Sequence, residues 1–125
     1  MKIKDYVNLF FITLVIIIIF TVLDYFTHQL SPEYSVPGYY FTNKIIFGIL
    51  IGFIALIFLN KINWGKRALL MSLIVSVLLQ TRYYLESYPK KFIWEFMLFH
   101  FLMLIISSFI VFYIYYKNKR VKFWQ

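Results

Sequence analysis

The sequence predicts an all-α membrane protein, a bundle of four transmembrane helices that forms a single domain over residues 1–125. Two observations support this fold class. First, 62% of the residues are hydrophobic and only 14% are charged, and one soluble core of this size cannot bury that much apolar surface. Second, four apolar stretches approach or exceed the ~20 residues needed to cross a bilayer. Short polar or proline-containing segments separate them.

The first apolar stretch predicts a span at residues 6–27. Lys2 and Lys4 precede it, as basic residues precede the apolar part of a secretory signal. The stretch is long enough to span, however, and it lacks the small residues of a cleavage site, so we expect an uncleaved helix. Pro32, Pro37 and Gly38 then prevent the helix from continuing.

The next two spans are predicted at residues 40–59 and 67–86, with a polar turn between them. Gly48 and Gly52 lie four residues apart in the second span, a spacing that lets another helix approach closely. The third span carries small or polar residues at every fourth position, which predicts a helix–helix seam. These residues are Ala68, Ser72, Ser76 and Gln80.

The fourth span is predicted at residues 92–116, after Pro89, and a basic tail follows it. Four spans place both ends of the chain and the turn near residue 63 on one side of the membrane. That side holds nine of the thirteen Lys and Arg residues. The positive-inside rule therefore predicts a multi-pass protein of the cell membrane with both termini in the cytoplasm.

The net charge of +8 comes from this cytoplasmic rim and favours contact with anionic membrane lipids. Nucleic-acid binding is not expected, because the basic residues lie at the ends of apolar stretches and not among aromatics on a solvated face. Other expected partners are a second copy of the chain or a larger membrane complex.

Ionisable and amide side chains gather in the predicted outer half of the bundle. Such groups are costly inside a bilayer and usually have a partner or a function. The predicted ligand-binding residues are Asp24, His28, Asn43, Gln80, Arg82, Glu95 and His100, and Lys44 lies at the same level.

Several pairings within this group are open from the sequence. Asp24 and His28 are four residues apart and share one helix face. Arg82 has two candidate partners, Glu86 one turn later or Asp24 on another helix. Counting ~1.5 Å per residue places His100 ~12 Å below the outer boundary and about 10 Å from the depth of His28. Two histidines at such different depths argue against haem ligation.

Asp24, His28 and His100 are the candidate metal ligands, and a divalent metal such as zinc accepts this nitrogen and oxygen set. With no cysteine in the chain, thiolate sites are excluded. A hydrogen-bonded polar plug of purely structural role is the competing interpretation. Arg82, Lys90, Lys91 and Lys44 are also placed to hold a lipid phosphate.

The leading functional hypothesis is a non-enzymatic binding or accessory membrane protein. Its polar pocket would recognise a lipid, a small polar ligand or a membrane partner. One alternative is a membrane-embedded metal-dependent or lipid-processing enzyme that uses Asp24, His28 and His100. A second is a small proton-coupled transporter, since the chain is similar in length to small multidrug transporters. The acid that those transporters carry in the middle of the first helix is absent here.

Overall fold

The computed structural model describes residues 1–119, which form four long helices and no strand. The helices are α1 (Ile3–His28), α2 (Tyr39–Phe58), α3 (Trp64–Leu85) and α4 (Lys90–Lys117), and a short 3-10 turn, η1 (Pro32–Tyr34), lies between α1 and α2. All four helices are long and apolar enough to cross a membrane. The predicted four-helix membrane fold is confirmed, and each helix begins and ends within three residues of its predicted span. Two basic residues counted for the topology, Arg120 and Lys122, lie outside the described residues.

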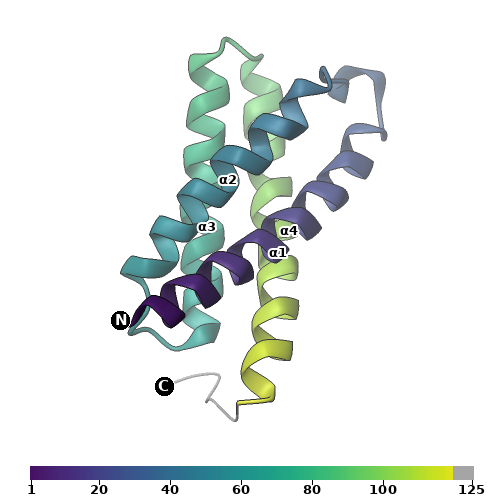
Figure 1. The fold of residues 1–125 in the computed structure, drawn as a ribbon. Helices are drawn as coiled ribbons and strands as arrows, with labels where there is room; N and C mark the ends of the chain where they lie inside the picture. Colours follow the sequence, from purple (N-terminus) through teal and green to yellow (C-terminus); the bar gives the residue numbers. More distant parts are fainter. Residues whose placement is uncertain (120–125) are drawn as a thin grey trace.

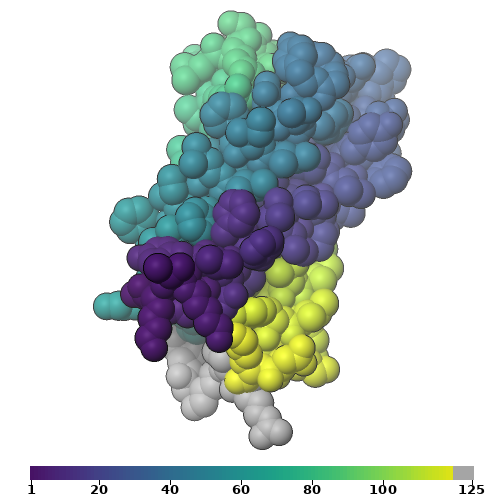
Figure 2. Space-filling view, in the orientation of Figure 1, coloured from purple at the N-terminus to yellow at the C-terminus, as the bar shows by residue number. Residues whose placement is uncertain are grey.

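The helices form a ring in chain order. α1 packs against α2 and α4, and α3 packs against the same two helices, with its larger contact on α4. Figure 1 shows α1 and α2 running obliquely across the α3–α4 pair. In the space-filling view of Figure 2, the side chains of α1 (purple) and α2 (teal) close against each other over this face.

The two ends of the bundle differ. The start of α1, the α2–α3 turn and the end of α4 lie together at the lower end in Figure 1. The α1–α2 connection and the α3–α4 turn lie at the other end, which we call the cluster end because it carries the site described below. Both chain ends of the helical bundle therefore lie on the same side, as four antiparallel spans require.

Local signals set the boundaries of α3 and α4. The Asn63 side chain caps α3 by accepting the backbone N–H of Lys66 at 3.1 Å. Between α3 and α4 the chain reverses through Ser87, which has a positive φ of 68°. Pro89 then precedes the first residue of α4, a position where its missing N–H costs no helical hydrogen bond.

Small residues bring α1 and α2 close together. A Cβ atom added to Gly52 would lie 3.0 Å from Thr13 Cγ2, and one added to Gly48 would lie 3.1 Å from Ile17 Cγ2. Such separations are shorter than ordinary carbon–carbon contacts. The expected close approach at this glycine pair is confirmed, and the partner helix is α1.

The predicted seam on α3 faces α4. All four of its residues are buried. Ser72 Oγ lies 3.3 Å from Ser108 Oγ, and Gln80 Nε2 donates a 2.7 Å hydrogen bond to the Ile93 carbonyl. The periodic small and polar positions thus form the most extensive helix pair of the bundle.

Candidate functional site: a buried cluster of Asp24, His28, Lys44 and His100

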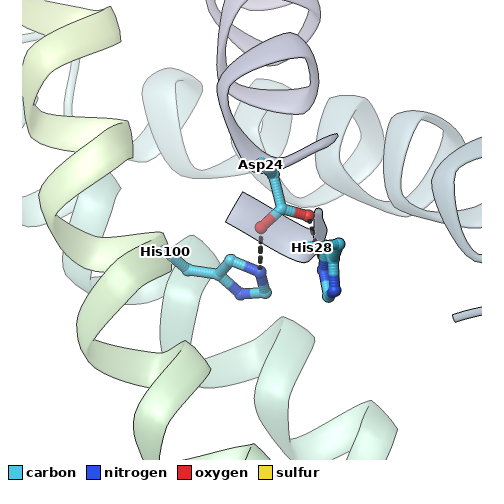
Figure 3. Close-up of side chains that lie close together, drawn as sticks. All are labelled: Asp24, His28 and His100. Atoms are coloured by element: carbon cyan, nitrogen blue, oxygen red, sulfur yellow. Dashed lines mark hydrogen bonds and ion pairs between the residues drawn. The ribbon is translucent and has the colours of Figure 1, made fainter. Parts of the chain in front are cut away.

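A single carboxylate joins three helices near the cluster end. Asp24, one turn before the end of α1, is fully buried, and it accepts a hydrogen bond from the Lys44 ammonium of α2 at Oδ2. His28 Nε2 lies 3.1 Å from the same oxygen, and His100 Nε2 of α4 lies 3.1 Å from Oδ1. Figure 3 shows the Asp24 carboxylate between the two imidazole rings. We call these four residues the ionisable cluster.

Lys44 supplies the positive charge of this cluster. Its side chain is 0% exposed, and a buried ammonium needs a counter-charge and hydrogen-bond acceptors. Besides Asp24, its Nζ contacts the Tyr40 hydroxyl at 3.0 Å and His100 Nε2 at 2.8 Å. It also lies 4.2 Å from the centroid of the Tyr40 ring, a cation–π distance. Lys44 therefore belongs to the core, and it is not placed to hold a lipid phosphate.

His28 faces an acceptor at each ring nitrogen. Its Nδ1 lies 2.6 Å from the Tyr34 carbonyl oxygen, which can only accept, so Nδ1 carries a proton. Its Nε2 faces the Asp24 carboxylate. In the neutral ring this nitrogen has a lone pair directed at a carboxylate oxygen. The contact between Nε2 and the carboxylate oxygen becomes favourable in any of three ways. The ring can take a second proton, Asp24 can be protonated, or a cation can lie beside the nitrogen and the oxygen.

The hydrogen-bond neighbours of His100 also conflict, at a single ring nitrogen. Its Nε2 contacts a donor, Lys44 Nζ, and an acceptor, Asp24 Oδ1. One ring nitrogen offers either a proton or a lone pair, so it cannot satisfy both neighbours at once. Its Nδ1 is buried and has no hydrogen-bond partner among residues 1–119. The cluster thus holds more ionisable groups than one Asp–Lys ion pair requires.

The expected separation of the two histidines in depth is wrong, and of the two partners that the sequence left open for Arg82 the structure shows Glu86. The ligand atoms of Asp24, His28 and His100 lie within 4.8 Å of one another, so the expected 10 Å separation of the histidines in depth does not hold. α1 crosses α4 obliquely (Figure 1), and the Asp24 and His100 side chains meet where these two helices pack. Arg82 does not reach Asp24, because Lys44 takes that place.

The other predicted site residues surround the cluster without joining it. Arg82 pairs with Glu86 at 2.9 Å on α3, which is the alternative partner considered above. Glu95 lies 3.9 Å from Lys91 on α4. Asn43 is half-buried beside Lys44, and among residues 1–119 no hydrogen bond links it to the cluster.

Glu95 also acts on the α1–α2 connection. Its carboxylate accepts a hydrogen bond from Tyr34, and this bond is the main reason that the pKa of Tyr34 is raised above its ordinary value. Since the Tyr34 carbonyl accepts the His28 proton, the same residue contacts both the cluster and an acidic residue beside it.

Sequence reasoning missed a second buried polar site, at the opposite end of the bundle. Arg67 is 8% exposed and donates hydrogen bonds to the carbonyls of Asn60 and Ile62 and to the Tyr116 hydroxyl. It was counted only as one of the basic residues near a turn. Arg67 stands at the start of a span, next to a polar turn whose carbonyls need donors. This position is the sequence signal that could have indicated its hydrogen bonds to the turn.

Aromatic side chains seal the ionisable cluster, and surface pockets lie around it. The His28 ring stacks on Phe96, with ring centroids 4.2 Å apart. One pocket, of about 260 Å³, reaches His28 beside the α1–α2 connection. A larger pocket of about 380 Å³ lies between α3 and α4 and is lined in part by Gln80. The exposed fractions of Asp24, His28 and His100 are 0%, 3% and 0%, so the cluster itself is closed.

Comparisons of the chain with protein-family models, with curated proteins and with solved structures found no match. Its function is therefore inferred from the geometry of the bundle. This geometry defines a small multi-pass membrane protein with a buried Asp–His–His group.

Proposed function

We propose that this chain is a non-enzymatic binding or accessory protein of the cell membrane that binds an anionic phospholipid at its cluster end. The site is the pocket of about 380 Å³ between α3 and α4. In this proposal both termini are cytoplasmic, as the positive-inside rule indicates, and the cluster end lies in the outer leaflet.

The charge on Lys90 carries the proposal. Four Lys or Arg residues lie toward the cluster end, and three of them have an acidic partner: Lys44 with Asp24, Arg82 with Glu86 and Lys91 with Glu95. Lys90 is exposed, lines the pocket, and has no acidic partner among residues 1–119. Its ammonium is therefore available to a phosphate group.

The remaining walls of the pocket suit the rest of a lipid molecule. Trp94 is 70% exposed and Tyr84 is 57% exposed, and both line the pocket. Such aromatic side chains favour the boundary between headgroups and acyl chains. Ile93 and Met97 add an apolar surface farther along α4. The pocket thus combines a cationic rim with an apolar wall, which is the pattern an amphiphile requires.

Buried hydrogen bonds hold together the helices at this end of the bundle. The Gln80 side chain bonds to the Ile93 carbonyl and so fixes the two walls of the pocket to each other. Asp24 holds α1, α2 and α4 together at the same end. Because Asp24 and His100 are 0% exposed, a substrate has no open path to the carboxylate, and we favour binding over catalysis.

Lipid-dependent thermal stabilisation tests the proposal. The purified protein in detergent is titrated with phosphatidylglycerol or with zwitterionic phosphatidylcholine, and Tm is recorded for the wild type, Lys90→Glu and Lys91→Glu. Lys91 is a matched control because it lies on the same turn and already faces Glu95.

We expect phosphatidylglycerol to raise the Tm of the wild type and of Lys91→Glu more than phosphatidylcholine does. Lys90→Glu should weaken the response to phosphatidylglycerol by about fivefold or more, since one basic residue near an anionic lipid contributes ~1 kcal/mol. An equal response of all three proteins would contradict the proposed site.

A further inference from the structure

We propose that Asp24, His28 and His100 bind a divalent transition metal such as zinc, and that the Lys44 ammonium is displaced when the metal binds. This inference goes beyond lipid binding and does not depend on it. In this view the ionisable cluster is a cation site that alternates between a tethered ammonium and a metal ion.

The spacing of the donor atoms fits a small metal. One nitrogen from each histidine and one carboxylate oxygen all lie within 4.8 Å of one another, and each histidine Nε2 is 3.1 Å from an Asp24 oxygen. Donors at ~2.0–2.1 Å from a tetrahedral zinc ion are about 3.3 Å apart. The two nitrogen–oxygen separations are close to that value, and each uses a different oxygen of the Asp24 carboxylate, Oδ2 for His28 and Oδ1 for His100.

The orientation of His28 matches that of a metal ligand. The Tyr34 carbonyl holds the proton on Nδ1, so the lone pair of the neutral ring is on Nε2, which faces Asp24. Metal-bound histidines commonly have this arrangement, with the second ring nitrogen donating to a carbonyl or carboxylate. A cation beside Nε2 and the carboxylate would remove the lone-pair repulsion described above.

Lys44 occupies the position of such a cation. Its Nζ contacts two of the three candidate ligands, Asp24 and His100, and both use the atoms that would bind a metal. The ammonium and a divalent ion cannot both stay there, because two unshielded positive charges in a buried space repel each other strongly. Metal binding therefore requires Lys44 to leave.

Lys44 has a short path out of the core. It lies five residues after the first residue of α2, ~7.5 Å along the axis from the cluster end. Long basic side chains at such depths extend toward the headgroup region. Displacement would break the contacts of α2 with Asp24 and His100, so metal binding would loosen α2 from α1 and α4.

Cobalt titration of the purified protein tests this site. Co²⁺ reports coordination by its visible absorption bands, and the Lys44→Met variant removes the competing ammonium while keeping an unbranched apolar side chain. We expect Lys44→Met to bind one Co²⁺ per chain at least about tenfold more tightly than the wild type, because the metal no longer has to displace an ammonium from two of its ligands. Adding Asp24→Asn or His100→Ala to this variant should abolish the bands.

Lys90→Met is the matched control, since it removes a basic residue from the same end but outside the cluster. An equal gain in Lys90→Met, or a folded Lys44→Met protein without cobalt bands, would overturn the inference. If Lys44→Met folds only when zinc is present, that dependence supports the site. If Lys44→Met folds neither with nor without zinc, the test is made on the wild-type protein. Cobalt bands in the wild type that are lost in His100→Ala support the site. The absence of cobalt bands from the wild type at saturating Co²⁺ overturns it.

Discussion

Replacing Asp24 by Asn should destabilise the bundle through the charge it leaves behind. The Asn side chain has nearly the same shape, but the buried Lys44 ammonium would lose its counter-charge. It must then stay buried and unpaired or give up its contacts with Tyr40 and His100, and either outcome costs stability. Breaking a buried ion pair by removing one partner costs about 3–5 kcal/mol. We expect a loss in this range, measured as the free energy of unfolding in mixed detergent micelles titrated with SDS.

The double variant Asp24→Asn/Lys44→Met separates this charge effect from lost packing. With neither charge present, it should recover at least half of the loss caused by Asp24→Asn alone. Glu86→Gln is the control, because its pair with Arg82 is partly exposed and exposed pairs contribute about 0–1 kcal/mol. A loss below about 1 kcal/mol for Asp24→Asn, or a double variant as unstable as the sum of the single ones, would refute the reasoning.

Three further predictions concern other parts of the bundle. Gly52→Leu should lower unfolding free energy by about 1–3 kcal/mol through overpacking against α1, whereas Gly38→Ala, which has open space around it, should change little in the same assay. Arg67→Ala should cost about 1.5–3 kcal/mol by removing charged hydrogen bonds at the opposite end, and an unchanged Tm would contradict this role. Glu95→Gln should lower the pKa of Tyr34 toward its ordinary value, because the carboxylate that disfavours the phenolate is lost. NMR titration of labelled tyrosine above pH 9 measures this shift.

The spans were predictable because each signal is local. Apolar stretches of the required length end at prolines or polar turns, and bilayer thickness sets their number of residues. The packing roles of the Gly48–Gly52 pair and of the stripe that includes Ser72 and Ser76 were also predictable, because residues four positions apart lie on one helix face. None of these inferences needs the relative orientation of two helices.

The convergence of Asp24, His28 and His100 was predicted as a group, but its pairings were not. Depth counted along each helix treats the spans as parallel rods, and the oblique α1–α4 crossing in Figure 1 breaks that assumption. The sequence offers Arg82 as a cation for Asp24, and it places Lys44 only at the same level of the membrane. Only the rotation of α2 about its axis, which the sequence does not encode locally, directs Lys44 inward.

The contact between Lys44 of α2 and Asp24 of α1 inside the bundle underlies both the stability of the cluster and the proposed metal site. Solid-state NMR of the protein in lipid bilayers tests it directly, through the dipolar coupling between Lys44 ¹⁵Nζ and Asp24 ¹³Cγ. The structure predicts a coupling that corresponds to an ion pair with nitrogen and oxygen within about 4 Å, and Asp24→Asn removes that pair. A Lys44 nitrogen with no measurable coupling to the Asp24 carboxyl carbon, in a protein that retains its four helices, would contradict the account.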